Sequence, residues 1–130
     1  MSRRRAFSGA PWEPVVGYCR AIRVGNRILV SGTAPVAEDG SAFAPGDGYA
    51  QTKRCIEIIE AAITELGGAL SDVVRTRMFV TDVDRWDEYG QAHGDAFGAF
   101  PPATAMVGVA RLIDPDWLIE IEAEAVVAGY

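Results

Sequence analysis

Residues 118–126, LIEIEAEAV, alternate between apolar and acidic side chains, and this pattern constrains the fold more than any other stretch of the chain. Successive side chains of a β-strand point to opposite faces. One face of this strand is therefore apolar, and the other carries Glu120, Glu122 and Glu124. We expect the apolar face to pack under helices and the acids to lie on the other side of a sheet.

The first half of the chain predicts a β-hairpin followed by a helix. Two strand-like runs within residues 15–35 flank the turn pair Gly25-Asn26. Residues 35–48 are rich in glycine and proline and predict a loop. Asp47 is expected to cap the helix that follows, which ends at Gly67-Gly68. Its buried stripe is predicted to contain Cys55, Ile59, Ala62, Ile63 and Leu66.

A third strand is predicted over residues 71–82. Its period-two pattern places Val74, Thr76, Met78 and Val80 on one side. The opposite side would carry Val73, Arg75, Arg77 and Phe79.

A second helix and two final strands complete the pattern. Asp84 is expected to cap the helix, and Pro101-Pro102 ends it. Strands over 103–112 and 117–127 follow, joined at Asp114-Pro115-Asp116. The apolar stripe of the helix is predicted to contain Trp86, Tyr89, His93, Ala96, Phe97 and Phe100.

The predicted order is ββαβαββ, which indicates an α+β fold: an antiparallel-rich sheet with two helices on one face. With 130 residues, 49% of them hydrophobic, the chain fits one domain over residues 1–130. Residues 1–14, which include the basic run Arg3-Arg4-Arg5, are expected to form a loosely ordered N-terminal arm.

Composition excludes several classes of function. The net charge of −6 argues against a nucleic-acid partner, because phosphate contacts require a basic surface. No apolar run is long enough for a membrane span, and the N-terminus does not resemble a secretory signal. Cys19 and Cys55 lie alone in apolar patterns, so we expect buried free thiols and a cytoplasmic protein.

The chain shows no standard metal or nucleotide motif. His93 is the single histidine, so a histidine-based metal cluster is not expected. His93 is predicted to be packed or interfacial, with a role as general base as the alternative. No glycine-rich nucleotide motif is present, and we expect no cofactor and no metal.

The face that carries the acids also carries other side chains. Arg75 and Arg77 flank Phe79 on one strand, and Val107 and Val109 accompany Arg111 on another. A solvated acidic row is one interpretation. Mixed charges among apolar side chains also suit contact with a partner subunit, which favours an oligomer with the sheets inside and the helices outside.

Four stretches together are similar to the RidA (YjgF) family, which includes the reactive-intermediate imine deaminases and was once labelled endoribonuclease. They are GYCRAIRVGNRILVSGTAPV, VVRTRMFVTDVDRW, FPPATAMVGVARL and LIEIEAEAVV, and the similarity spans about residues 15–128. The resemblance implies a chorismate-mutase-like α+β fold. It also implies a homotrimer with a ligand cleft at each subunit interface.

The resemblance assigns roles to individual residues. Glu120 matches the glutamate that handles the attacking water. Thr104 stands where the active imine deaminases have the arginine that grips the substrate carboxylate, and Met106 replaces the cysteine of that motif. Tyr18 and the pair Ser31-Gly32 match residues that line the pocket, and the loop before Glu120 is one residue longer than usual.

The resemblance leads to two functional hypotheses. The first is a hydrolase for a small enamine, imine or related metabolite, with Glu120 handling water. Simple 2-imino acids would not be its typical substrates, since Thr104 cannot pair with a carboxylate as an arginine does. The alternative is a non-catalytic small-molecule-binding or regulatory module of the same fold. Whether Arg20, Arg75 or Arg77 restores a cation to the cleft is left open by the sequence, and a ribonuclease is disfavoured by the acidic charge.

Overall fold

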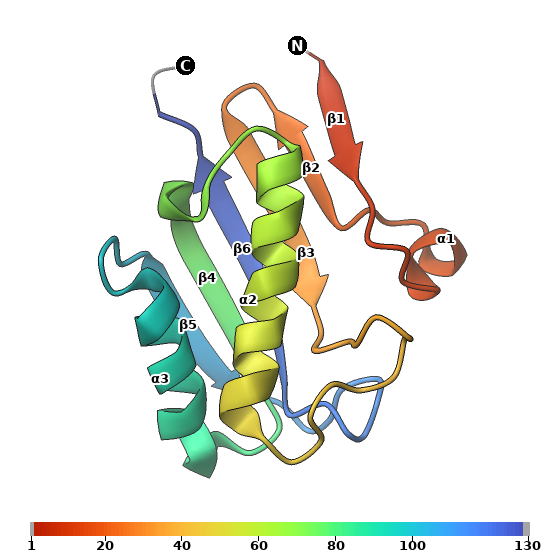
Figure 1. Cartoon of the computed structure of the whole chain (residues 1–130), viewed down its shortest axis with the longest axis vertical. Helices are drawn as coiled ribbons and strands as arrows, with labels where there is room; N and C mark the ends of the chain where they lie inside the picture. The colour runs from red at the N-terminus through yellow and green to blue at the C-terminus, as the bar shows by residue number, and fades with distance from the viewer. Residues whose placement is uncertain (1, 129–130) are drawn as a thin grey trace.

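The computed structural model describes residues 2–128, so residues 1 and 129–130 of the predicted domain lie outside the described residues. Six strands form one sheet with the order β1-β2-β3-β6-β4-β5. Helices α2 and α3 lie side by side on one face of it (Figure 1). The strands are β1 (Arg3–Ala6), β2 (Ala21–Val24), β3 (Arg27–Thr33), β4 (Val73–Val80), β5 (Ala103–Gly108) and β6 (Ile119–Val126). The α-helices are α1 (Trp12–Val16), α2 (Gly48–Glu65) and α3 (Trp86–Phe97), and short 3₁₀ turns cover Leu70–Asp72 and Val83–Arg85.

The sheet is built around β6, which pairs antiparallel with β3 on one side and with β4 on the other. Only β4 and β5 pair in parallel, because α3 carries the chain back across the sheet between them. The predicted α+β class, the antiparallel-rich sheet and the placement of both helices on one face are confirmed.

The structure contains the hairpin and the first long helix that local sequence signals predict. Strands β2 and β3 pair from Ala21–Val30 to Val24–Arg27, so Gly25 and Asn26 form the connecting turn. Gly25 has a φ of +61°, a conformation open to glycine. The Asp47 carboxylate accepts a hydrogen bond from the Ala50 amide at 2.9 Å and caps α2.

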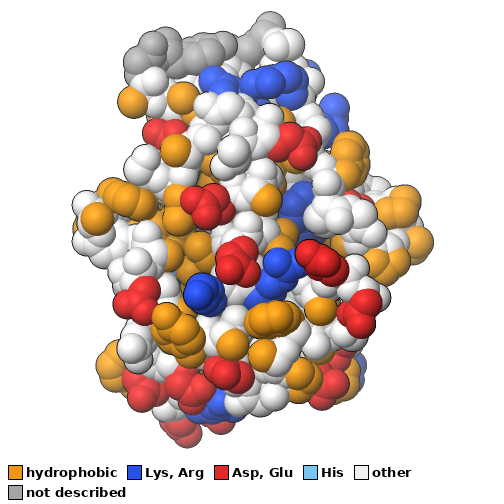
Figure 2. All heavy atoms as spheres, viewed as in Figure 1, with side chains coloured by type: hydrophobic (Ala, Val, Ile, Leu, Met, Phe, Trp, Pro, Cys, Tyr) orange, Lys and Arg blue, Asp and Glu red, His pale blue; other side chains and the backbone are white. Residues whose placement is uncertain are grey.

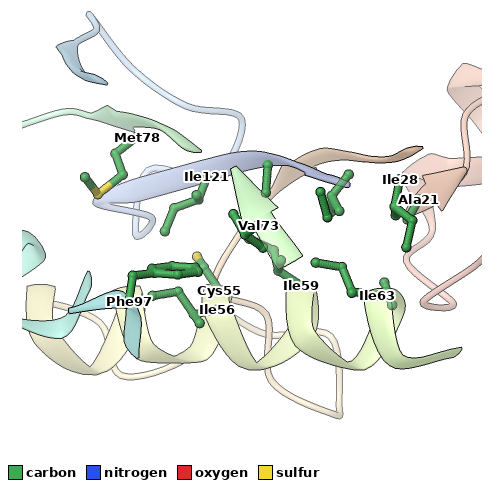
Figure 3. Close-up of a cluster of buried hydrophobic side chains, with 14 of the residues drawn as sticks. Ala21, Ile28, Cys55, Ile56, Ile59, Ile63, Val73, Met78, Phe97 and Ile121 are labelled. Carbon is green, nitrogen blue, oxygen red and sulfur yellow. The ribbon is translucent and has the colours of Figure 1, made fainter. Parts of the chain in front are cut away.

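The core lies between α2 and the sheet. Figure 3 shows apolar side chains of the helix meeting those of the strands, with Phe97 of α3 closing one end. The predicted stripe of α2 is buried, as are the apolar residues of β6 that alternate with its acids. The stripe is Cys55, Ile59, Ala62, Ile63 and Leu66; the residues of β6 are Ile119, Ile121, Ala123 and Ala125.

The prediction for the start of β4 was wrong. Val73 is 3% exposed and faces the core, whereas Val74 is 46% exposed. The pairing of β4 with β6 shifts register between Val73 and Arg75, and such a bulge reverses the alternation at this point. From Thr76 onward the predicted faces are correct, with Thr76 and Met78 buried.

The start of the second helix also differs from the prediction. Asp84 does not cap α3, whose N-cap residue is Arg85 and makes no capping side-chain hydrogen bond. The Asp82 side chain instead accepts a hydrogen bond from the Asp84 amide at 3.2 Å and begins the 3₁₀ turn before the helix. Trp86 is therefore the first residue of α3, and it is 63% exposed instead of buried.

The predicted strand over 103–112 is shorter than expected. Strand β5 ends at Gly108, and the Val109 amide donates to the Val80 carbonyl at 2.8 Å before the chain leaves the sheet. Arg111 consequently lies beyond the strand.

Residues 1–14, predicted as a loosely ordered arm, contain two elements that we did not predict. Strand β1 pairs antiparallel with β2, from Arg3–Val24 to Ala6–Ala21, and helix α1 follows. The Arg4 side chain also donates to the Leu66 carbonyl at 3.1 Å, at the end of α2. Three of the four residues of β1 are arginines, so the strand has no apolar alternation that would predict it. It forms because the edge of β2 offers unpaired backbone groups.

We expect Ile59→Ala to lower the free energy of unfolding by about 2–5 kcal/mol, because it leaves a cavity between α2 and the sheet. Ile59 is fully buried in the core cluster. Ile113→Ala is the matched control, since Ile113 is 73% exposed and its truncation should change stability by about 0.5 kcal/mol or less. Urea denaturation measures both, and equal losses would contradict this assignment of the core.

Candidate functional site

One cavity of about 460 Å³ lies where the N-terminal arm, one side of α2 and the end of β3 meet the loop before β6. Of the residues predicted to form the site, Tyr18, Gly32 and Glu120 line it. These three come from distant parts of the sequence. Their meeting place is therefore a candidate ligand site.

Glu120 lies at an opening of the sheet. The last pair between β3 and β6 is Thr33–Ile121, so β3 no longer covers β6 at Glu120. Burial raises the pKa of the Glu120 carboxyl above its ordinary value of 4.5, although the nearby charge of Arg20 lowers it. Across residues 2–128, no hydrogen bond or salt bridge reaches this carboxyl group. A half-buried, unpaired carboxyl group suits an acid or base that works on a bound molecule.

Gly32 gives Glu120 the space it occupies. A Cβ atom at Gly32 would collide with the Glu120 carboxylate. Its neighbour Ser31 points elsewhere: the Ser31 hydroxyl donates to the Cys19 carbonyl at 2.7 Å, and Ser31 does not line the cavity. Gly32 therefore belongs to the cavity by its lack of a side chain, and Ser31 ties β3 to Cys19, in the short segment between Tyr18 and β2.

Of the three arginines that the sequence left open, Arg20 is the one that lines this cavity, together with Arg54 of α2. Its Nη1 donates to the Gly32 carbonyl at 2.9 Å and to the Thr33 hydroxyl at 3.1 Å, and its guanidinium lies 5.4 Å from the Tyr18 ring. Its Nε lies 3.4 Å from a Glu13 carboxylate oxygen, close enough for an ion pair but out of line for a hydrogen bond. Glu13, 2% exposed, also accepts hydrogen bonds from the amide and hydroxyl of Ser8.

Arg75 and Arg77 lie away from Glu120. Both line a second hollow of about 240 Å³ on the uncovered face of the sheet. There Arg77 Nη1 lies 2.9 Å from a Glu122 oxygen and 3.8 Å from a Glu124 oxygen. Two of the three acids of β6 thus belong to surface ion pairs, which leaves Glu120 as the acid of the cavity.

Thr104 and Met106 do not meet Glu120 within one chain. Both lie on β5, and β4 separates that strand from β6. The Thr104 hydroxyl lies 2.8 Å from the Thr76 hydroxyl, which in turn lies 2.8 Å from His93 Nε2. Met106 packs against the core. A site that contains both Thr104 and Glu120 therefore needs a second copy of the chain.

His93 is a buried histidine in this structure. Its ring packs on Phe97 with centroids 4.6 Å apart, and desolvation lowers the pKa of the imidazole below 6.5. The hydrogen bond to Thr76 satisfies one ring nitrogen. These contacts describe a residue that packs between α3 and β4 and does not line the cavity.

Two residues that line the cavity, and one that pairs with Arg20 behind it, were missed from the sequence. Trp12 and Trp117 line the cavity with their rings edge to face, centroids 5.3 Å apart, and Glu13 neutralises Arg20. The Nε1 of Trp117 is buried and has no hydrogen-bond partner among residues 2–128. The available signals were the run APWEP around Trp12 and the longer loop before Glu120. Neither indicates that Trp12 contacts Trp117, which lies 105 positions later.

The described residues contain neither a group suited to a metal ion nor a helix suited to crossing a membrane. No group of three or more histidine, cysteine or acidic side chains is placed to hold a metal ion. No described helix combines the length and the apolar character that crossing a membrane requires. Both cysteines are free thiols, Cys55 buried and Cys19 partly so.

Comparison with known proteins identifies close relatives. A family model described as endoribonuclease L-PSP matches residues 8–127. A RutC family protein of Pyrococcus abyssi is 36% identical over 96% of this chain and 98% of its own length. The 3-aminoacrylate deaminase RutC of Acinetobacter baylyi is 33% identical over 90% of this chain and 91% of its own.

A solved structure shows the same fold. The crystal structure of a YjgF/YER057c/UK114 family member from Mycobacterium tuberculosis superimposes with a TM-score of 0.88. It is 44% identical, and the match covers 97% of this chain and all of that one. The expected chorismate-mutase-like α+β fold is confirmed by this likeness.

We expect Glu120→Gln to stabilise the protein at neutral pH. Because the folded-state pKa is raised, the fold holds this proton over a range where the unfolded chain has lost it. Ionisation of Glu120 therefore costs stability as the pH rises above 4.5, and Gln avoids this cost. Urea denaturation from about pH 4 to pH 8 should show a gain that is small in acid and grows with pH.

Glu122→Gln on the same strand is the control for that series. It removes the 2.9 Å ion pair with Arg77 and should give no gain at any pH. A gain for Glu120→Gln that is independent of pH would show that burial of the charge is not its cause.

Proposed function

Because this chain belongs to the endoribonuclease L-PSP family, which includes the RidA (YjgF) proteins, we propose that it hydrolyses a small enamine, imine or related metabolite. The observation that carries the proposal is Glu120: an unpaired carboxyl group with a raised pKa in the wall of a cavity. A carboxylate with a raised pKa binds a proton more firmly than a solvated carboxylate does, so it is a stronger general base and is tuned toward neutral pH.

The reaction requires one proton acceptor and a bound water. Water attacks the carbon of the C=N bond while the Glu120 carboxylate takes a proton from it, and the electron pair of the C=N bond moves to nitrogen. The protonated Glu120 passes its proton to the nitrogen of the carbinolamine. The carboxylate then accepts the hydroxyl proton as the C=O bond forms and the C–N bond breaks, which releases the carbonyl compound and the amine. Gly32 contributes by leaving the carboxylate room to move between water and substrate.

The absence of an arginine at position 104 limits the substrates. The Thr104 hydroxyl is neutral and already bonded to Thr76 and, at 3.3 Å, to the Pro102 carbonyl. It cannot supply the two parallel charge-assisted bonds with which a guanidinium grips a carboxylate. We therefore propose that simple 2-imino acids are not the typical substrates, in spite of the similarity to a 3-aminoacrylate deaminase. Ribonuclease activity is not proposed, since the net charge is −6.

We propose that the working form is a homotrimer with the cleft at each subunit interface. The sheet face opposite α2 and α3 exposes Leu29, Val107 and Val126 beside the Arg77–Glu122 pair, a mixture that suits a subunit contact. A second chain is also the way to bring Thr104 and Met106 to the cavity of Glu120. The free thiols Cys19 and Cys55 support a cytoplasmic location for this assembly.

The second candidate is a binding or regulatory module with the same cleft. The observation that favours it is Thr104. Without an arginine at this position the cavity still binds a ligand, but it does not fix a carboxylate group in the position that a reaction needs. The two candidates differ in one respect: only the hydrolase needs the Glu120 carboxylate to accept a proton.

The trimer is tested by sedimentation equilibrium at micromolar concentration. We expect a single species of three chains, because the uncovered sheet face carries exposed apolar side chains. Val107→Asp on β5 should weaken the assembly by burying an unpaired charge. Val15→Asp is the control and should not weaken it, because Val15 lies in α1, outside the sheet, and is 84% exposed. A stable monomer of the unaltered protein rules out the interface cleft.

The catalytic role is tested with imines generated in solution by amine and amino-acid oxidases and followed by competition with semicarbazide. We expect Glu120→Gln to reduce any accelerated hydrolysis by about 10²–10⁴-fold, the usual contribution of a general base. His93→Gln is the matched control, since it also replaces a buried titratable group with Gln. It should change the rate little, because His93 contacts Thr76 and Phe97 and not the cavity. Equal losses from the two variants would refute the role of Glu120.

A further inference from the structure

The charges around the cavity are predominantly negative. Four carboxylates and two guanidiniums line it: Glu38, Glu57, Glu65 and Glu120, with Arg20 and Arg54. Acidic side chains are also spread over the helical face of the molecule in Figure 2. A cavity with this balance attracts cations and repels anions.

Both guanidiniums are already bound to groups of the chain. Arg20 is held by the buried Glu13 carboxylate, the Gly32 carbonyl and the Thr33 hydroxyl. Arg54 donates from Nε to the Val36 carbonyl at 2.8 Å, and its Nη1 lies 3.8 Å from Glu57. An anionic ligand would have to compete with Glu13, a 2% exposed carboxylate, for Arg20. Glu120, in contrast, has its charge unmatched by any hydrogen bond.

The apolar part of the wall is aromatic. Trp117, 3% exposed, meets Trp12 edge to face, and Tyr18 lies on the same cavity. The faces of aromatic rings attract cations as well as other rings.

We propose that the cavity binds cationic imines that carry an aromatic group and no carboxylate, the iminium ions derived from aromatic primary amines. This inference rests on the proposed hydrolase function and specifies its substrate class. The iminium nitrogen pairs with the Glu120 carboxylate, and the ring lies against Trp12 and Trp117. The class excludes imines of amino acids. Their carboxylate would face Glu120 and the acidic rim formed by Glu38, Glu57 and Glu65.

The chemistry balances without a cofactor. The iminium ion R–CH=NH₂⁺ and water give the aldehyde R–CHO and NH₄⁺. A C–O bond forms to water as the C=N pair moves to nitrogen, and Glu120 takes a proton from the water and passes it to the amine. The Glu120 carboxylate then accepts the hydroxyl proton of the carbinolamine as the C=O bond forms and the C–N bond breaks, and this second proton goes to the released ammonia to give NH₄⁺. The reaction class that must supply this substrate is the two-electron oxidation of a primary amine to its imine.

Binding is tested first, with two probes of the same ring and opposite charge: benzamidine, a cation, and benzoate, an anion. Trp86→Phe removes the exposed indole outside the cavity, so the fluorescence reports Trp12 and Trp117. We expect quenching by benzamidine with a Kd about tenfold or more below that of benzoate, as a charge-assisted bond replaces a repulsion. Benzamidine binding should strengthen as the pH rises through the raised pKa of Glu120.

Two variants connect that preference to named groups. Glu120→Gln should remove both the charge preference and its pH dependence, while Trp12→Leu should weaken both probes alike. Equal or tighter binding of benzoate by the unaltered protein overturns the inference. If the charge preference persists in Glu120→Gln, the preference comes from the acidic rim, and the proposed pairing with Glu120 is overturned.

Turnover is tested with two imines that share a side chain: one formed from 2-phenylethylamine by an amine oxidase, the other from phenylalanine by an amino-acid oxidase. We expect kcat/KM for the amine-derived imine to exceed that for the imino acid by about tenfold or more. Trp117→Leu should lose activity on the phenyl compound but retain it on the imine of ethylamine. Preference for the imino acid overturns this substrate class while the hydrolase proposal stands. Hydrolysis of neither imine overturns the hydrolase proposal, and the preference for benzamidine then identifies a cation-binding module.

Discussion

The pairing of β6 with both β3 and β4 is the constraint on which the other elements depend. Strict alternation gives this central strand an apolar face, and Ile119, Ile121 and Ala123 are buried beneath the helices. The stripe of α2 packs on that face, and α3 returns the chain to form the parallel pair of β4 and β5. With β6 in register, the acids follow on the opposite side, and the early departure of β3 leaves Glu120 at an opening.

The same geometry makes Glu120 costly for the fold and useful for chemistry. Removing a carboxylate from water raises its pKa, and no partner compensates for that loss of solvation. Its neighbours show how such a cost is usually met: the buried Arg20 and Glu13 neutralise each other, and Glu122 pairs with Arg77 at the surface. Side chains that are left without partners in a cavity are where a protein can bind and transform another molecule.

The hydroxyl at position 104 belongs to another environment. The bonds from Thr104 to Thr76 and from Thr76 to His93 join the edge strand β5 to helix α3, so they serve the packing of that corner. Thr104, which the resemblance of the sequence motifs places at the position of a substrate-binding arginine, here takes part in a neutral hydrogen-bond chain. The cation nearest to Glu120 comes instead from Arg20, whose charge is matched within the chain.

Local patterns in the sequence were enough for β2, β3, β6 and most of β4, the cap at Asp47, the turn at Gly25-Asn26 and the buried stripe of α2, because each depends on residues close together in the chain. They were also enough, with the family motifs, to single out Tyr18, Gly32 and Glu120. The bulge at Val74 and the strand β1 escaped prediction, since both are set by the register of a neighbouring strand. Only the tertiary structure decided which side chains share the cavity. Trp12 meets Trp117, and Arg20 donates to Gly32 and Thr33, because pairings between separate segments place them there and no local periodicity records such pairings.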